Sequence, residues 1–240
     1  PTPTKQLPTA APTQVPTITP VPTLVPAIFY LKEGSMSYKE GQLNSDGGVA
    51  SAMTAVVCNK GSLAGDVLVG LYDNRVKVGD VSLGLSAGSS DVANFNDVVL
   101  PPGSHDLELR VDSVSEKLSV YVPKPADVHF EGGFVSEEVA FNEGSGLAGY
   151  VVKGRVENSG ERSADFVAAI TLDGVVLDGV SGLSVGPGGG VEIAFNVGGL
   201  ASGTHGLKAV TDYHGEVVEL EENRLNNLKD VVVVVPEPGK

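Results

Sequence analysis

The chain repeats part of its own sequence at an offset of 98 to 100 residues, and no other feature limits its possible folds as strongly. The segment Val57–Asn74, VCNKGSLAGDVLVGLYDN, aligns with Val156–Gly174, VENSGERSADFVAAITLDG. The paired markers are Asn59 with Asn158, Gly61 with Gly160, Asp66 with Asp165, Gly84–Gly88 with Gly182–Gly186, Gly103–His105 with Gly203–His205, and Asp112 with Asp212. Their shared order indicates two tandem copies of one structural unit.

Each copy has the pattern of an all-β unit. Short apolar segments rich in β-branched residues alternate with turn residues, and no long segment has helical periodicity. The 31 glycines, 15 prolines and absence of tryptophan agree with this class. Because the segments have the spacing of a β-sandwich, we expect an all-β chain with two tandem sandwiches after an extended segment rich in proline and threonine.

The domain boundaries follow from the repeat and from the prolines. We place the extended segment at residues 1–27, the sandwiches at 28–122 and 126–236, and a short tail at 237–240. Val122–Pro125 contains two prolines, which interrupt a strand and predict a short, stiff hinge.

In the second copy we predict hairpin turns at Asn158–Gly160 and Asp173–Gly174, and a loose loop at Gly186–Gly190. The strands expected there are Asp127–Phe134, Ala148–Val156, Asp165–Leu172, Val191–Val197, Gly206–Thr211, Val217–Glu219 and Val231–Val235. We expect the last of these to pack in the core, because five exposed valines in a row would favour aggregation.

The end of the second copy carries a dense group of carboxylate and amide side chains. These are Asp212, Glu219, Glu221, Glu222, Asn223, Asn226 and Asn227. The first copy has no counterpart to the last four of them, since its final hairpin continues directly into the closing strand.

This group resembles the last hairpin of the CARDB family of cell-surface, immunoglobulin-like modules. The matching residues are Asp212, Val217–Glu219, Glu222–Asn223 and Asn226–Asn227, together with an early turn at Val156–Gly160. The resemblance covers about residues 125–236. It implies an extracellular, immunoglobulin-like sandwich that serves in adhesion or as a spacer, and it implies no catalysis.

Calcium prefers six to eight oxygen ligands from carboxylates, amides and carbonyls, and the group offers several of these. The candidate ligands are Asp212, Glu219, Glu222, Asn223 and Asn226. The alternative is structural: Asn223, Asn226 and Asn227 bind backbone groups while the glutamates are solvated. The spacing does not match an EF-hand loop, so the sequence leaves both interpretations open.

The net charge and the absence of catalytic motifs argue against nucleic-acid binding, anionic-lipid binding and catalysis. A formal net charge of −14 opposes binding to nucleic-acid phosphates or anionic lipids. The sequence has no zinc-protease, nucleophile-elbow or phosphate-loop motif, and His105 and His205 occupy equivalent positions that favour a structural role. The single cysteine, Cys58, lies in an apolar run where we expect a buried thiol. We therefore expect no enzyme.

Residues 1–26 contain eight prolines and seven threonines, which predicts an extended segment typical of an O-glycosylated stalk or of a linker. The candidate glycosylation sites are Thr2, Thr4, Thr9, Thr13, Thr17, Thr19 and Thr23. We also expect this segment to take part in assembly, with Ile18, Val21, Leu24 and Val25 contacting a neighbouring subunit. No run of 18 apolar residues predicts a membrane span, and a start at Pro1 without methionine fits an exported polypeptide that has lost a leader.

Three function classes remain. The first is a structural protein outside the cell, either a stalk segment or a filament subunit that assembles through its modules and its N-terminal segment. The second is a cation-dependent adhesin or ligand-binding module whose partners are surface proteins or glycans. The third is an accessory domain of a secreted enzyme.

Overall fold

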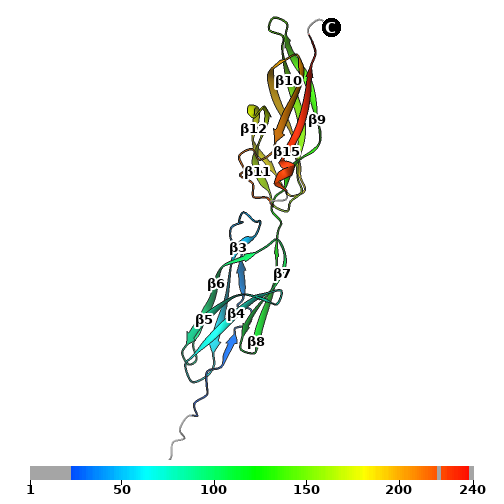
Figure 1. The fold of residues 1–240 in the computed structure, drawn as a ribbon. Coiled ribbons are helices and arrows are strands. Elements are labelled where there is room, and N and C mark those ends of the chain that lie inside the picture. Colours follow the sequence, from blue (N-terminus) through cyan, green and yellow to red (C-terminus); the bar gives the residue numbers. More distant parts are fainter. Residues whose placement is uncertain (1–22, 221–222, 238–240) are drawn as a thin grey trace, which may run out of the picture.

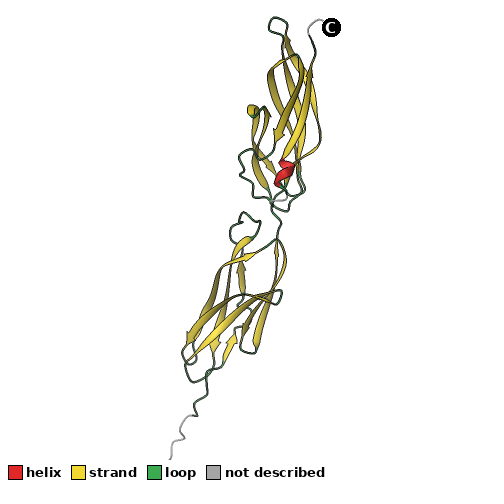
Figure 2. Cartoon of the chain, in the orientation of Figure 1, coloured by secondary structure: helices red, strands yellow, loops and turns green. Residues whose placement is uncertain are grey.

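The computed structural model describes residues 23–220 and 223–237. These residues form two β-sandwiches joined end to end, each with its own hydrophobic core (Figure 1). The described residues contain no α-helix, and their only helical element is one short 3₁₀ turn, η1 (Figure 2). The predicted all-β class with two tandem sandwiches is confirmed.

The first module packs a sheet of β1, β3, β2 and β6, in which β3 pairs with the other three strands, against a sheet in the order β5-β4-β7-β8. Its strands are β1 Phe29–Leu31, β2 Ser37–Lys39, β3 Val49–Asn59, β4 Gly65–Asp73, β5 Val76–Leu85, β6 Ser90–Leu100, β7 Gly103–Val111 and β8 Val114–Val122.

The second module packs a sheet in the order β13-β10-β9 against one in the order β12-β11-β14-β15. Its elements are β9 Val128–Asn142, β10 Leu147–Asn158, β11 Ala164–Leu172, β12 Val175–Val185, β13 Gly190–Ala201, β14 Gly203–Val210, η1 Arg224–Asn227 and β15 Leu228–Val235. Strand for strand this is the topology of the first module, with β9 in the place of β1 and β2, as the sequence repeat predicts.

Alternation along the strands decides which side chains enter the cores. In β3 the buried positions are every second residue from Val49 to Asn59, so Cys58 points to the outer face and is half-buried. The prediction of a buried thiol was therefore wrong. In β15 the same alternation buries Val231, Val233 and Val235 but leaves Val232 and Val234 exposed, so only alternate valines of the closing strand pack in the core.

Two further local predictions were wrong, and one strand was not predicted. Val217–Glu219 is not a strand, because the Asp212 carboxylate takes the backbone N–H groups of Glu216 and Val217. β12 is a full strand that the sequence did not indicate. Asn158–Gly160 does not close a hairpin but carries the chain from one sheet to the other, since β10 pairs with β9 and β13 only.

The predicted turn at Asp173–Gly174 is confirmed. It joins β11 to β12, and both residues have the positive φ angles, +50° and +81°, that a two-residue hairpin loop requires.

Candidate functional site

An acidic corner, residues 211–227, separates β14 from β15. It lies at the end of the second module that faces the first (Figure 1). Its residues 221–222 lie outside the described residues, and the candidate ligand Glu222 lies there with them. Thr211 anchors the start of the corner, because its N–H donates to Asn227 O (2.9 Å) and its hydroxyl to Val128 O (3.1 Å). The corner thus begins bound to both β9 and η1.

Asp212 is almost completely buried and folds the first turn of the corner. Its carboxylate accepts the N–H groups of Glu216 (2.8 Å) and Val217 (3.1 Å). Its own φ of +45° matches the φ of +48° at Asp112, the equivalent residue in the first module. Both carboxylate oxygens of Asp212 thus hold the turn, a role in which aspartate is common.

Glu219 has an exposed fraction of only 1%, although it lies in a loop. Its Oε1 accepts the Val128 N–H (2.8 Å) at the start of β9, and its Oε2 accepts the Asn227 side-chain amide (2.6 Å). Burial raises the pKa of Glu219, while these two hydrogen bonds oppose the rise. The carboxylate links β9 to η1, and its bond to Val128 joins residues that are 91 positions apart in sequence.

The side chains of two of the three asparagines bind carboxylates. Asn226 donates its amide to Asp127 Oδ1 (2.9 Å), Asn227 donates to Glu219, and Asn223 precedes η1 without capping it through its side chain. Asp212 and Glu219 line one hollow of about 300 Å³, together with Asn227 and Arg224. The structural alternative was wrong in its details, because the amides of Asn226 and Asn227 bind carboxylates instead of backbone groups and Glu219 is buried instead of solvated. The contacts of these residues nevertheless hold the corner together within the protein.

Calcium binding by the corner stays a prediction. Among the described residues no group of three or more His, Cys, Asp and Glu side chains is placed to hold a metal. If the corner binds calcium through Asp212, Glu219 and Glu222, the melting temperature of the second module should be higher with excess calcium than with a chelator. A hundredfold excess over Kd adds about 2.7 kcal/mol to the free energy of unfolding. Equal melting temperatures in calorimetry would contradict the site.

We predict that Glu219→Gln leaves the second module as stable as the wild type at pH 7, or more stable. Glutamine avoids burying a charge. Its oxygen accepts the Val128 N–H, and its amide donates to Asn227 Oδ1 once the Asn227 amide turns over, since Nδ2 of Asn227 faces Glu219 in the wild type and Oδ1 has no partner there.

The stability difference between the wild type and Glu219→Gln should depend on pH. A carboxyl with a raised folded-state pKa contributes stability that is fully present below its unfolded pKa and is lost as pH rises through the folded pKa. The melting temperature of the wild type should therefore rise relative to that of Glu219→Gln as pH falls from 7 towards 4. Glu219→Ala, which leaves the Val128 N–H unpaired, should lose stability at every pH. A wild type that gains nothing relative to Glu219→Gln in acid would contradict the buried carboxylate.

A buried asparagine holds the equivalent end of each module, although the sequence predicted a hairpin turn at one of the two. Asn158 donates to the carbonyls of Arg162, Val185 and Gly186, and it accepts the N–H groups of Gly160 and Asp127. Asn59 makes the same five contacts, with Leu63, Leu85, Ser86, Gly61 and Ile28. The loop at Gly186–Gly190 is consequently held in place, with Gly188 N–H donating to Asn158 O (2.9 Å).

The two modules meet at a joint formed by Val122–Ala126 and the side chains around it. Glu161 accepts both the Tyr121 hydroxyl (2.5 Å) and the Lys124 N–H (2.9 Å). These two bonds lower the pKa of Glu161. The chain at the joint is thereby fixed to the second module from two directions.

The first module also contacts the second directly. Arg162 pairs with Glu40 and donates to Pro123 O (3.4 Å). A Cβ added at Gly47 would lie 2.7 Å from the Leu220 side chain and 2.8 Å from Pro125, so the loop after β2 lies close against the acidic corner.

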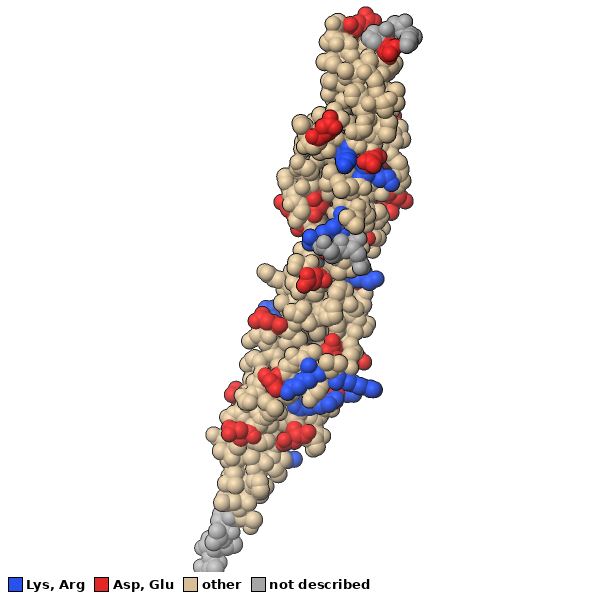
Figure 3. Space-filling model, viewed as in Figure 1, with Lys and Arg blue, Asp and Glu red and all other residues tan. Residues whose placement is uncertain are grey.

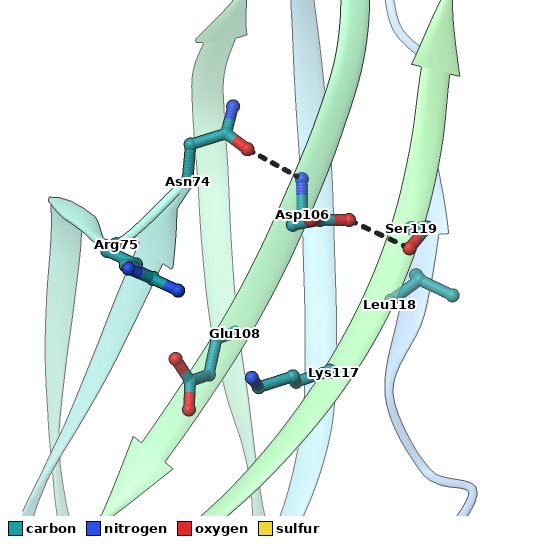
Figure 4. Close-up of a pocket in the computed structure, with 7 residues that line it drawn as sticks. All are labelled: Asn74, Arg75, Asp106, Glu108, Lys117, Leu118 and Ser119. Atoms are coloured by element: carbon teal, nitrogen blue, oxygen red, sulfur yellow. Dashed lines mark hydrogen bonds between the residues drawn. The ribbon is translucent and has the colours of Figure 1, made fainter.

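A shallow groove of about 410 Å³ lies at the β7–β8 side of the first module (Figure 4). Arg75 and Lys117 face it together with Asp106 and Glu108, and Asp106 accepts the Ser119 hydroxyl (2.9 Å). The two positive and two negative side chains balance one another in charge. His105 and His205 bind the carbonyls of Pro101 and Ala201, each at 2.7 Å, which places both in the structural role expected for them.

Charge is scattered over the face of the molecule shown in Figure 3. Acidic side chains occur along both modules, and basic side chains form small groups among them. No helix of the described residues is both long and apolar enough to cross a membrane.

The family model of CARDB matches residues 39–117 and 135–230, one segment in each module. The chain belongs to the CARDB family. The resemblance noted in the second copy is thereby confirmed and extends to the first. CARDB modules are non-catalytic, immunoglobulin-like domains of surface or extracellular proteins. None of the curated proteins compared with the chain matches it in sequence.

Solved structures give only weak similarities. A red sea bream transglutaminase has 10% identity and a TM-score of 0.31, over 86% of this chain and 32% of its own. A β-glucuronidase from glycoside hydrolase family 2 has 11% identity and a TM-score of 0.34, over 76% of this chain and 24% of its own. A calcium-binding mutant of Bacteroides uniformis β-glucuronidase 2 has 11% identity and a TM-score of 0.33, over 87% of this chain and 33% of its own. The chain spans about a quarter to a third of these structures, and we draw no functional conclusion from them.

Proposed function

We propose that the chain is a non-catalytic structural segment of a protein outside the cell, in which two CARDB modules act as an extended spacer. The observation that carries this proposal is the joint. A short linker with two prolines has few backbone conformations, and contacts from Glu161, Arg162 and Gly47 fix it further. A spacer needs such a joint, because a freely hinged pair of modules does not hold a distance.

The dimensions fit this role. A strand of 12 residues, such as β10, spans about 40 Å at a rise of about 3.3 Å per residue, so two sandwiches end to end span roughly 80 Å. Within the extended segment, Thr23 is exposed, and the other candidate threonines lie outside the described residues. Their O-glycosylation stays a prediction that mass spectrometry of the native protein checks.

Spin labels test the joint. The labelling sites are Ser82→Cys and Ser181→Cys, exposed positions on β5 and β12, in a chain that carries Cys58→Ser. Double electron–electron resonance should give a single narrow distance distribution between the two modules.

A loosened joint is the comparison. Pro123→Gly combined with Glu161→Gln should broaden the distribution, while Glu143→Gln, at an exposed tip far from the joint, should not. A wild-type distribution as broad as that of the loosened variant would overturn the proposal, because the modules would then move independently.

A further inference from the structure

The joint inside the chain brings together two surfaces that each module possesses. We call the end with the buried asparagine the near pole and the opposite end the far pole. At the joint, the far pole of the first module meets the near pole of the second. The near pole of the first module and the far pole of the second lie at opposite ends of the molecule (Figure 1).

The two near poles have the same construction. A Cβ at Gly61 would lie 2.1 Å from Pro26 O, and one at Gly160 would lie 2.1 Å from Pro125 O, so the incoming chain passes equally close in both modules. The Val25 N–H donates to the Ser62 side chain (2.5 Å), just as the Lys124 N–H donates to Glu161. Residues before the first module thus follow the course of the linker before the second.

The two far poles are also alike. The loop Asn44–Gly48, which contacts the second module, has its counterpart in Asn142–Gly146 between β9 and β10. In each loop the first asparagine accepts backbone N–H groups, from Asp46 and Gly48 in one and from Ser145 in the other. The loop that forms the joint therefore exists a second time, at the end of the second module that lies away from the joint.

The poles that lie outside the joint expose apolar side chains at positions where the joined poles have polar ones, beside the exposed Glu143 of the loop Asn142–Gly146. The near pole of the first module exposes Leu24, Val25, Ile28 and Leu63, and Leu63 stands where the second module has Arg162. The far pole of the second module exposes Val139, Leu147 and Val234, and Val234 stands where the first module has Tyr121. Leu24 and Val25 are two of the residues for which the sequence predicted subunit contacts.

We propose that copies of this chain associate head to tail, with the near pole of one first module on the far pole of the next copy's second module. The contact repeats the joint with apolar groups in place of its ion pair and its tyrosine hydrogen bond. Because the same two unlike surfaces recur on every copy, the association does not close and gives a linear array. This proposal rests on the proposed structural role and adds the two surfaces through which copies of the chain would associate.

The test is sedimentation of the full chain over a concentration series. The ends of a sandwich offer less than the roughly 1,200 Å² of a standard interface, so the contact is weak and the series extends to about 1 mM. We expect the mean mass to rise with concentration. The rise should be larger in 0.5 M than in 0.05 M salt, because salt screens the repulsion between copies that each carry a net charge of −14.

Three substitutions locate the contact. Leu63→Asp and Leu147→Asp, both at exposed positions, should each abolish the rise without lowering the melting temperature. A mixture of the two should form one-to-one dimers only, because each variant keeps one intact pole. Val76→Asp, at an exposed position on β5, is the matched control and should associate like the wild type.

A chain that stays monomeric at every concentration would overturn the head-to-tail contact, and so would loss of association on deletion of residues 1–22, since the N-terminal segment would then be the contact. Loss in Leu63→Asp alone would indicate like poles meeting, which also contradicts it. A monomer with a narrow inter-module distance would leave the spacer role in place.

Discussion

Asn158→Leu should unfold the second module at temperatures where the wild type is fully folded. The substitution removes five hydrogen bonds in a site that is 1% exposed. It takes these bonds from the N–H groups of Gly160 and Asp127 and from three carbonyls, of which Gly186 O keeps the Gly189 N–H. Each buried group left unpaired costs about 1–3 kcal/mol, so the loss exceeds about 3 kcal/mol even after relaxation. For a domain of this size, that lowers the melting temperature by about 12–25 °C.

Calorimetry should separate the two modules. Asn158→Leu lowers the transition of the second module, and Asn59→Leu lowers that of the first by a similar amount, because the two residues make equivalent contacts. Asn196→Leu, at an exposed position on β13, should change neither transition by more than about 0.5 kcal/mol. A loss at Asn158 no larger than at Asn196 would show that the buried amide does not hold the pole.

The same asparagine shows what the sequence could and could not predict. The repeat paired Asn59 with Asn158, and the structure confirms that they are equivalent. The type of turn was nevertheless misjudged, because Asn followed by Ser-Gly is typical of a hairpin when only local backbone preferences are considered. The partners of Asn158 lie up to 31 residues away in sequence, and no local pattern reveals them.

The acidic corner was located from sequence because its composition is unusual and the first module lacks it. Its internal contacts were not predictable, since whether Glu219 faces solvent or β9 depends on how the loop folds over the end of the sandwich. The missed strand β12 has a related cause. Its segment VVLDGVSGLSV contains two glycines and an aspartate, which lower its strand propensity, and it forms a strand because β11 pairs along its length.

Sequence predicted the closing strand but not its register. Five consecutive valines have no visible alternation, so nothing in them tells which face is buried. Pairing with β14 decides it, because His205 opposite Val233 and Leu207 opposite Val231 turn those valines inward. Neighbouring valines with opposite environments allow a matched experiment.

Val233→Asp should unfold the second module completely, while Val232→Asp should leave it folded. Val233 is 0% exposed and Val232 is 63% exposed, although the two side chains are identical and adjacent. At position 233 the substitution loses about 1.5–3 kcal/mol of apolar burial and adds several kcal/mol for an unpaired buried carboxylate. The sum approaches the roughly 5–15 kcal/mol that holds a domain of this size.

Amide spectra and limited proteolysis measure the outcome. In Val233→Asp, the signals of the first module should persist while those of the second collapse to the unfolded range, because the two hydrophobic cores share no residue. Equal melting temperatures for the two variants would contradict the register of β15. If Val233→Asp unfolded both modules together, the joint would couple them more strongly than its few side-chain contacts imply, and the spacer would behave as one cooperative unit instead of two.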